Sequence, residues 1–259
     1  MNPLILTVFI LSLLLGASHG ADLLLGIDPQ TGLCIAGSVW WRYLALAVVV
    51  LAAVLAGRKV GIRLETVRSR QPLAGMLSFA AAVCFAAAGA AQLLASAGGI
   101  TQLIRVVLDI LCAVWFICLG RSWLCTEQWQ TPTRTLIPAV FGSVLFYWNV
   151  LMRFMENSSS WHRVQPTAAV WQEMAAVLFL AALVRALYLP QENTQRSLGA
   201  TALAATVLCL CWQLPQTLEA FLTERMTFSL LANGLSGLGL CCVGGVAAAC
   251  MAAEAKKKG

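Results

Sequence analysis

The chain has 259 residues, of which 60% are hydrophobic and only 11% are charged, and its mean hydropathy is +0.81. Soluble domains carry about 25% charged residues and about 45–50% apolar ones. A soluble fold of this length could not cover so much apolar surface, so the composition excludes a soluble globular protein. Several apolar runs of nearly 20 residues instead predict an all-α, polytopic transmembrane helix bundle. Because the intervening polar stretches are short, we expect residues 1–259 to form a single transmembrane helical domain, with no soluble domain.

The first apolar run, from Pro3 to about Leu15, is short for a membrane span and resembles the apolar core of a signal peptide. Residues 16–21 offer the small side chains of a cleavage zone. No Lys or Arg precedes the run, which favours an uncleaved helix instead. The sequence therefore predicts about eight helices, or seven if residues 1–20 are removed.

The later apolar runs define the remaining predicted helices. In the eighth and last predicted helix, the small residues Gly237, Cys241, Gly245 and Ala249 recur four positions apart. This spacing lets helix backbones approach closely in lipid. We expect the seventh helix to stop at Pro215 and residues 216–227 to form a short helix on the outer surface. The predicted helices after the first one are 39–56, 73–96, 101–121, 136–153, 167–187, 198–214 and 228–252.

The basic residues predict how the bundle is oriented. The stretch 57–71 carries five Arg and Lys residues against one Glu, and cytoplasmic loops collect Lys and Arg, so we place it inside. Both termini are then inside as well (N-in/C-in), and we expect a multi-pass protein of the plasma membrane. The basic residues placed inside, 12 of the 17, are Arg58, Lys59, Arg63, Arg68, Arg70, Arg121, Arg134, Arg185, Arg196, Lys256, Lys257 and Lys258.

The acidic residues have the opposite bias, since seven of the 11 fall in the outer half. The net charge of +6 therefore reflects topology, and we expect no nucleic acid among the partners. The expected partners are the lipid bilayer, anionic lipid at the basic stretch 57–71, and another membrane protein or a second copy of the chain. The outer acids are Asp22, Asp28, Asp109, Glu156, Glu173, Glu219 and Glu224.

The ten cysteines lie mostly inside the apolar runs. None forms a C-x-x-C pair, and no histidine is close enough in sequence to suggest zinc. We interpret them as small buried hydrophobic side chains, and we expect neither a metal nor a cofactor. Only Cys34 and Cys125 are expected to be accessible to reagents.

Four polar residues share one depth in the outer third of the predicted bundle. At ~1.5 Å per residue, Arg105 lies about 6 Å and Asp109 about 12 Å below the outer end of the fourth helix. Asn149 lies about 6 Å below the outer end of the fifth helix, and Glu173 about 8 Å down the sixth. Charged groups at such depths usually face other helices or a water-filled cavity. The sequence therefore predicts a ligand or ion pocket formed by these four residues.

A purely structural interpretation competes with this pocket. Arg105 and Asp109 are four residues apart, on one helix face, where they would neutralise each other while Glu173 stays at the interface. Polar pairs between membrane helices contribute only about 0.6 kcal/mol on average, so a structural role is a sufficient explanation.

The sequence favours a non-enzymatic accessory, scaffold or sensor-like membrane subunit, because it combines close-packing seams and short loops with no catalytic motif. The alternative is a small-solute or ion transporter with an outward-facing polar pocket. A second alternative is an intramembrane or lipid-acting enzyme. Residues 234–237 spell G-x-S-G, which resembles the serine motif of rhomboid intramembrane proteases. A serine–histidine dyad also needs a histidine on a neighbouring helix, and His19 and His162 both fall near predicted outer loops.

Overall fold

The computed structural model of the chain describes residues 2–27, 35, 37–95, 99–124, 130–156, 164–189, 191 and 194–257. Within these ranges the regular structure is helical, with no strand. Eight of the described helical stretches are long and apolar enough to cross a bilayer. The prediction of an all-α, polytopic bundle is confirmed, and the chain is an integral membrane protein. Five residues used above lie outside the described ranges: Asp28, Cys34, Cys125, His162 and Lys258.

The membrane-crossing stretches include six single helices and two rods that contain a π-helical turn. The single helices are α1 (Pro3–Leu25), α2 (Val39–Val60), α4 (Pro72–Ala95), α5 (Ile100–Leu124), α6 (Ile137–Glu156) and α7 (Val164–Tyr188). The first rod consists of α8 (Thr194–Leu208), the π-helical segment η1 (Cys209–Gln213) and α9 (Leu214–Leu222). The second consists of α10 (Phe228–Cys241), the π-helical segment η2 (Cys242–Ala247) and α11 (Ala248–Lys257). A short helix, α3 (Leu64–Val67), lies between α2 and α4.

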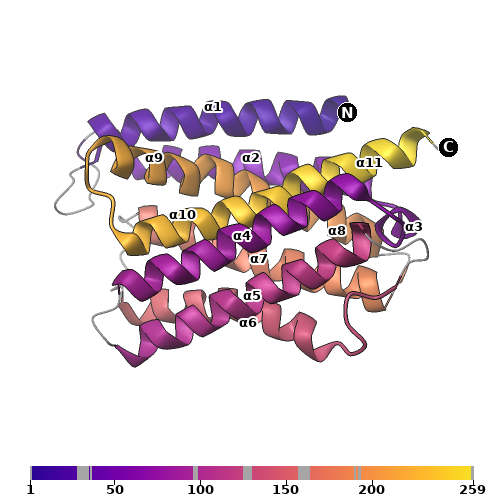
Figure 1. Ribbon diagram of the computed structural model, residues 1–259. Coiled ribbons are helices and arrows are strands. Elements are labelled where there is room, and N and C mark those ends of the chain that lie inside the picture. The colour runs from indigo at the N-terminus through magenta and orange to yellow at the C-terminus, as the bar shows by residue number, and fades with distance from the viewer. Residues whose placement is uncertain are drawn as a thin grey trace.

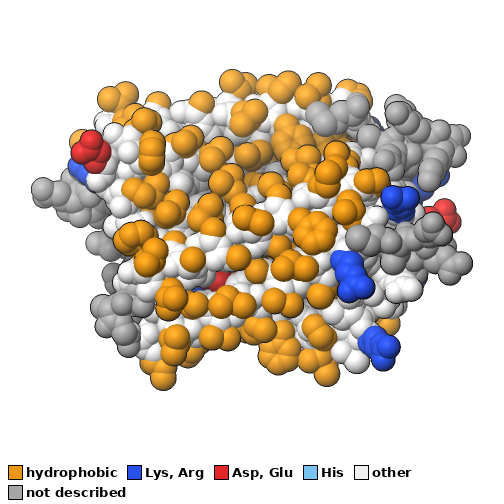
Figure 2. All heavy atoms as spheres, in the orientation of Figure 1, with side chains coloured by type: hydrophobic (Ala, Val, Ile, Leu, Met, Phe, Trp, Pro, Cys, Tyr) orange, Lys and Arg blue, Asp and Glu red, His pale blue; other side chains and the backbone are white. Residues whose placement is uncertain are grey.

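The long helices run side by side, and α1 begins at the end of the bundle at which α11 ends (Figure 1). Helix α3 lies at this end too, and Lys and Arg side chains gather there, while hydrophobic side chains cover the visible face between the two ends (Figure 2). We call it the basic end. A chain that starts and finishes at one end fits an even number of spans, as predicted. The distribution of basic residues predicts that the basic end is the cytoplasmic one.

The segment 57–71 folds onto the bundle at the basic end. The Arg68 guanidinium donates to the carbonyl oxygen of Leu187 at 2.9 Å, in the last turn of α7. The Trp123 indole N–H of α5 donates to the carbonyl oxygen of Val67 at 2.8 Å. The segment therefore ties helix ends together, and it leaves four basic side chains exposed. These are Arg58, Lys59, Arg63 and Arg70.

The first helix is longer than predicted, because α1 continues through residues 16–21 to Leu25. The apolar run ends near Leu15, but the polar residues that follow face the bundle: the His19 ring stacks on Trp212 with centroids 3.8 Å apart. The Cys211 thiol of η1 also donates to the carbonyl oxygen of Ser12 at 3.2 Å. Helix α1 therefore packs on its neighbours over most of its length.

The prediction that the seventh helix stops at Pro215 is wrong, because the helix continues as α9 to Leu222. A proline in a regular α-helix removes a hydrogen bond and clashes with the preceding turn. Here the turn just before the proline is the wider π turn η1, in which Leu214 N–H bonds to the carbonyl oxygen of Cys209, five residues back. The wider π turn accommodates Pro215 without ending the helix. The residues up to Leu222 therefore extend the membrane-crossing stretch.

Helices α4, α5 and α10 pack closely together. The Phe85 ring of α4 stacks on Phe116 of α5 at 5.2 Å, and the Ser78 hydroxyl donates to the carbonyl oxygen of Phe116 at 2.8 Å. On the side of α10, a Cβ added at Gly239 would lie 3.0 Å from the Phe85 ring. The small-residue seam predicted along the eighth helix is confirmed, since each of its four members is buried. They are Gly237, Cys241, Gly245 and Ala249.

Helices α2 and α8 cross at a contact between two glycines. A Cβ added at Gly57 would lie 2.4 Å from the carbonyl oxygen of Gly199, and one added at Gly199 would lie 2.6 Å from that of Gly57. Both obstacles are backbone atoms, so neither can move aside as a side chain would. Contacts of this kind drive helix association in lipid, where there is no hydrophobic force between helices.

We therefore expect Gly57→Ala to destabilise the protein by about 1–3 kcal/mol, since the added methyl group forces the two backbones apart. Gly20→Ala is the matched control, because its Cβ would lie at an ordinary 3.8 Å from Pro215. The control should be neutral or stabilising, as alanine favours helix by up to about 1 kcal/mol over glycine. Thermal unfolding of both variants in detergent checks this, and equal melting temperatures would contradict the close-contact explanation.

Candidate functional site

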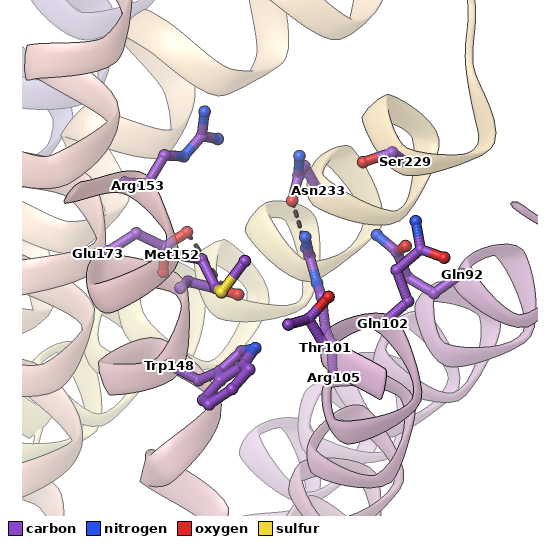
Figure 3. A pocket seen from close by; sticks show the side chains of 11 residues that line it. Gln92, Thr101, Gln102, Arg105, Trp148, Met152, Arg153, Glu173, Ser229 and Asn233 are labelled. Carbon is purple, nitrogen blue, oxygen red and sulfur yellow. Dashed lines mark hydrogen bonds between the residues drawn. The ribbon is translucent and has the colours of Figure 1, made fainter. Parts of the chain in front are cut away.

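A polar cavity opens between five helices at the end opposite the basic end, and its volume is about 210 Å³ (Figure 3). It lies near the start of α5 and α10 and near the end of α4 and α6. Thr101 and Ser229, two of its lining residues, are exposed, so the cavity reaches the surface of the protein. The residues that line it are Gln92, Thr101, Gln102, Arg105, Trp148, Asn149, Met152, Arg153, Glu173, Ser229 and Asn233.

Three of the four predicted site residues line this cavity: Arg105, Asn149 and Glu173. They come from α5, α6 and α7, which are separate in sequence, and their similar depths bring them together as the counting of residues along each helix predicted. The fourth, Asp109, lies one turn further along α5 and does not line the cavity.

Arg105 is half-buried on the α5 side of the cavity, and its guanidinium donates to the side-chain carbonyl oxygen of Asn233 on α10 (Figure 3). A guanidinium has five N–H donors, so it can bind more than one acceptor. The two residues lie 128 positions apart, and their contact joins the fourth span to the last.

Glu173 lies on the opposite side of the cavity, on α7 (Figure 3). The Asn149 side-chain amide of α6 donates to its Oε1 at 3.4 Å, which is long for a hydrogen bond. Arg153 lies one turn beyond Asn149 on α6 and is also half-buried in the lining. The cavity therefore presents a carboxylate flanked by an amide on one side and a guanidinium on the other.

Asp109 is fully buried, at 0% exposure, below the cavity. Neither of its carboxylate oxygens accepts a hydrogen bond from the residues that the structure describes. A Cβ added at Gly89 of α4 would lie 3.3 Å from the Asp109 Cβ, so α4 packs directly against it. An ionised carboxylate in such surroundings is very unfavourable, and it is stabilised when it binds a proton or a cation. Arg105 and Glu173 are close enough to interact with it electrostatically.

The structural interpretation, in which Arg105 and Asp109 neutralise each other along one helix, stays a prediction. The Arg105 guanidinium donates to Asn233, and Asp109 forms no hydrogen bond within the described part of the chain. The two charged groups are close enough to interact electrostatically, so the arrangement fits both the pocket and the structural interpretation.

Sequence reasoning missed three polar members of the lining, which come from α4 and α10: Gln92, Ser229 and Asn233. Gln92 lies three residues before the end of α4, and Asn233 lies five residues after the start of α10. Counting depth along every predicted helix, not only along those with charged residues, would have found them. Gln92 is 2% exposed and its side-chain N–H₂ donates to no described residue, so it too has unused polar capacity.

Three further polar residues of the membrane-crossing helices, Gln172, Gln213 and Ser236, do not line the cavity. The Gln172 amide donates to the Cys209 sulfur at 3.4 Å, between α7 and η1. Gln213 packs against Gly237, where an added Cβ would lie 2.9 Å from its Cγ. The Ser236 hydroxyl of the G-x-S-G stretch is buried and donates to the carbonyl oxygen of Ala232 in its own helix, at 3.0 Å. This serine is therefore part of a packing seam.

The cavity can bind a small polar solute by charge and hydrogen bonding. Arg105 and Arg153 can bind carboxylate or phosphate oxygens, while Glu173 can bind an ammonium group across the cavity. The amides of Gln92 and Asn149 add neutral donors and acceptors. Comparison of the chain with protein-family models, with curated proteins and with solved structures gave no match.

We expect Asp109→Asn to leave the thermal stability unchanged or raise it by up to about 1–3 kcal/mol, because it removes a buried carboxylate that receives no hydrogen bond. The contrasting variant is Asp22→Asn, since Asp22 forms an ion pair with Arg42 at 2.5 Å between α1 and α2. That variant should lower the melting temperature. If Asp109→Asn lowers it as much as Asp22→Asn does, Asp109 has a structural role.

Proposed function

We propose that this protein is a small-solute transporter that binds a zwitterionic or anionic solute in its outward-facing cavity. The observation that carries the proposal is the convergence of charged and amide side chains from five helices on a surface-open cavity at one depth. Charged groups inside a membrane protein are costly, and they mark substrate and ion pathways. We also propose that the membrane is the plasma membrane and that, by the bias of the basic residues towards the other end of the bundle, the cavity faces outward.

The volume of the cavity limits the size of the solute. About 210 Å³ corresponds to roughly seven water molecules at ~30 Å³ each. Pockets for drug-sized molecules begin at about 300 Å³. The solute is therefore comparable in size to a small amino acid or a short carboxylic acid. Two arginines against one glutamate favour a solute with a carboxylate or phosphate group and no net positive charge.

Asp109 and the two π-helical segments support transport over simple binding. Asp109 lies one turn below Arg105, where a proton or cation bound to it interacts electrostatically with the cavity. The segments η1 and η2 interrupt the two rods deeper in the bundle, and π turns within α-helices are frequent at functional sites. A carboxylate that gains and loses a proton below a solute cavity is a suitable coupling group.

An accessory or scaffold role is the second candidate, and one specific observation favours it. Helix α4 leaves small side chains exposed on one side, at Ala80, Ala87 and Ala90. Small residues on a lipid-facing surface allow another helix to approach closely. We place this role second because it does not require the polar cavity. Its test is the oligomeric state in nanodiscs: a stable dimer that Ala87→Leu dissociates would support it.

The binding step can be tested with the purified protein and a panel of small amino acids, acetate and succinate as probes. A true ligand at 100 times its dissociation constant should stabilise the protein by about 2.7 kcal/mol. Arg105→Ala should weaken that stabilising effect for every carboxylate probe, with an affinity loss of about 10- to 100-fold, whereas Glu173→Gln should weaken it for the amino acids, which carry an ammonium group. Arg225→Ala is the control, because Arg225 is exposed and does not line the cavity. Equal losses in all three variants would contradict the proposed site.

The transport step needs a separate measurement in proteoliposomes. We expect uptake of the identified solute to respond to an imposed proton or sodium gradient, and Asp109→Asn to abolish this response while binding persists. The Arg225→Ala control should retain gradient-driven uptake. Unchanged coupling in Asp109→Asn would remove Asp109 from the mechanism, whereas binding without any flux would favour a sensor.

A further inference from the structure

A second and larger cavity lies on the lipid-facing side of the bundle, and it runs from the basic end to the level of Trp171 on α7. It is a groove of about 850 Å³ between α2 and α7, with α8 along its floor. Its walls are mostly apolar, with Ala47 and Val54 on α2, Leu178 on α7 and Ala204 on α8. It shares no lining residue with the polar cavity.

Two contacts define the length of this groove. Towards the outer end, the Tyr43 ring of α2 meets Trp171 of α7 with centroids 5.6 Å apart, so α2 and α7 touch there. Towards the basic end, Gly57 and Gly199 hold α2 against α8. The wall on α2 runs from Ala47 to the residue after Gly57, a rise of about 16 Å. This matches one leaflet, half of the ~30 Å hydrocarbon core.

The basic end of the groove carries two arginines, Arg58 from α2 and Arg196 from the first turn of α8. Both side chains are exposed, and neither forms an ion pair within the part of the chain that the structure describes. An apolar channel of one leaflet's length that ends in two guanidinium groups is complementary to a lipid with an anionic headgroup. Basic pockets between membrane helices on the cytoplasmic side bind such headgroups.

We infer that this groove binds an anionic phospholipid of the cytoplasmic leaflet. The phosphate accepts hydrogen bonds from Arg58 and Arg196, and one acyl chain lies along α8 between α2 and α7. A membrane helix is a poorer occupant, because it has no phosphate group to accept hydrogen bonds from the two arginines at the basic end of the groove. The inference is independent of the proposed transport function, because the groove and the polar cavity are separate.

Native mass spectrometry with added dioleoyl phosphatidylglycerol or dioleoyl phosphatidylcholine tests the headgroup. The wild-type protein should retain the anionic lipid selectively. The double variant Arg58→Gln/Arg196→Gln should lose about 30-fold in affinity for it, with little change for phosphatidylcholine. The matched control is Arg63→Gln/Arg70→Gln, which removes the same charge from exposed residues of the basic end that do not line the groove. Equal losses in both double variants would show a diffuse surface charge effect and overturn the site.

The position of the acyl chain is tested with Ala47→Phe, in which the larger side chain fills the groove from α2. The control is Val48→Phe, because the neighbouring Val48 does not line the groove. Both positions are exposed, so neither change disturbs the core. Only Ala47→Phe should displace bound phosphatidylglycerol. Glycerol phosphate, which lacks acyl chains, should not compete with the lipid. If Ala47→Phe does not displace the bound lipid, the inference is wrong. It is also wrong if a second copy of the chain occupies the groove, which would give a stable dimer that Ala47→Phe dissociates.

Discussion

The hydrocarbon core of the membrane contains no water to hydrogen-bond with polar groups, so these groups must find partners within the protein. The architecture of this protein follows from that constraint. Backbone groups must be paired within each segment, which explains why the described spans are helices throughout. Side-chain charges must face other helices or water. Arg105, Glu173 and Arg153 therefore turn inward at one depth, and the amides of Asn149 and Asn233 accompany them. The polar cavity results from polar residues on five helices that avoid lipid in the same layer.

Asp109 is the residue that this constraint alone does not explain. Two other buried polar residues do have partners: Ser78 donates to Phe116, and the Trp123 indole to Val67. Asp109 is as deeply buried as they are, yet its carboxylate accepts no hydrogen bond from any described residue. A side chain kept in a costly state is more characteristic of function than of stability, since functional sites depart from the arrangement that favours folding.

Helix α7 links the two cavities. Glu173 faces the polar cavity, while its neighbours Trp171 and Met174 line the lipid-facing groove. Successive residues on a helix point in different directions, so residues of one turn of α7 line both the polar cavity and the lipid-facing groove. A displacement of α7 at this turn would alter both cavities together.

The number of spans, their approximate limits and the shared depth of Arg105, Asn149 and Glu173 could be predicted from the sequence, because hydropathy and helical rise are local properties. The way each helix faces its neighbours was decided by tertiary packing. In lipid, an apolar surface that faces a helix and one that faces the bilayer have the same composition. For this reason Ala86 and Ala90 of α4 are exposed, although their four-residue spacing is the spacing of a packing seam. The contact of Arg105 with Asn233, the burial of Asp109 and the continuation of the helix past Pro215 likewise depend on side-chain fit between segments that are distant in sequence or on a local π turn.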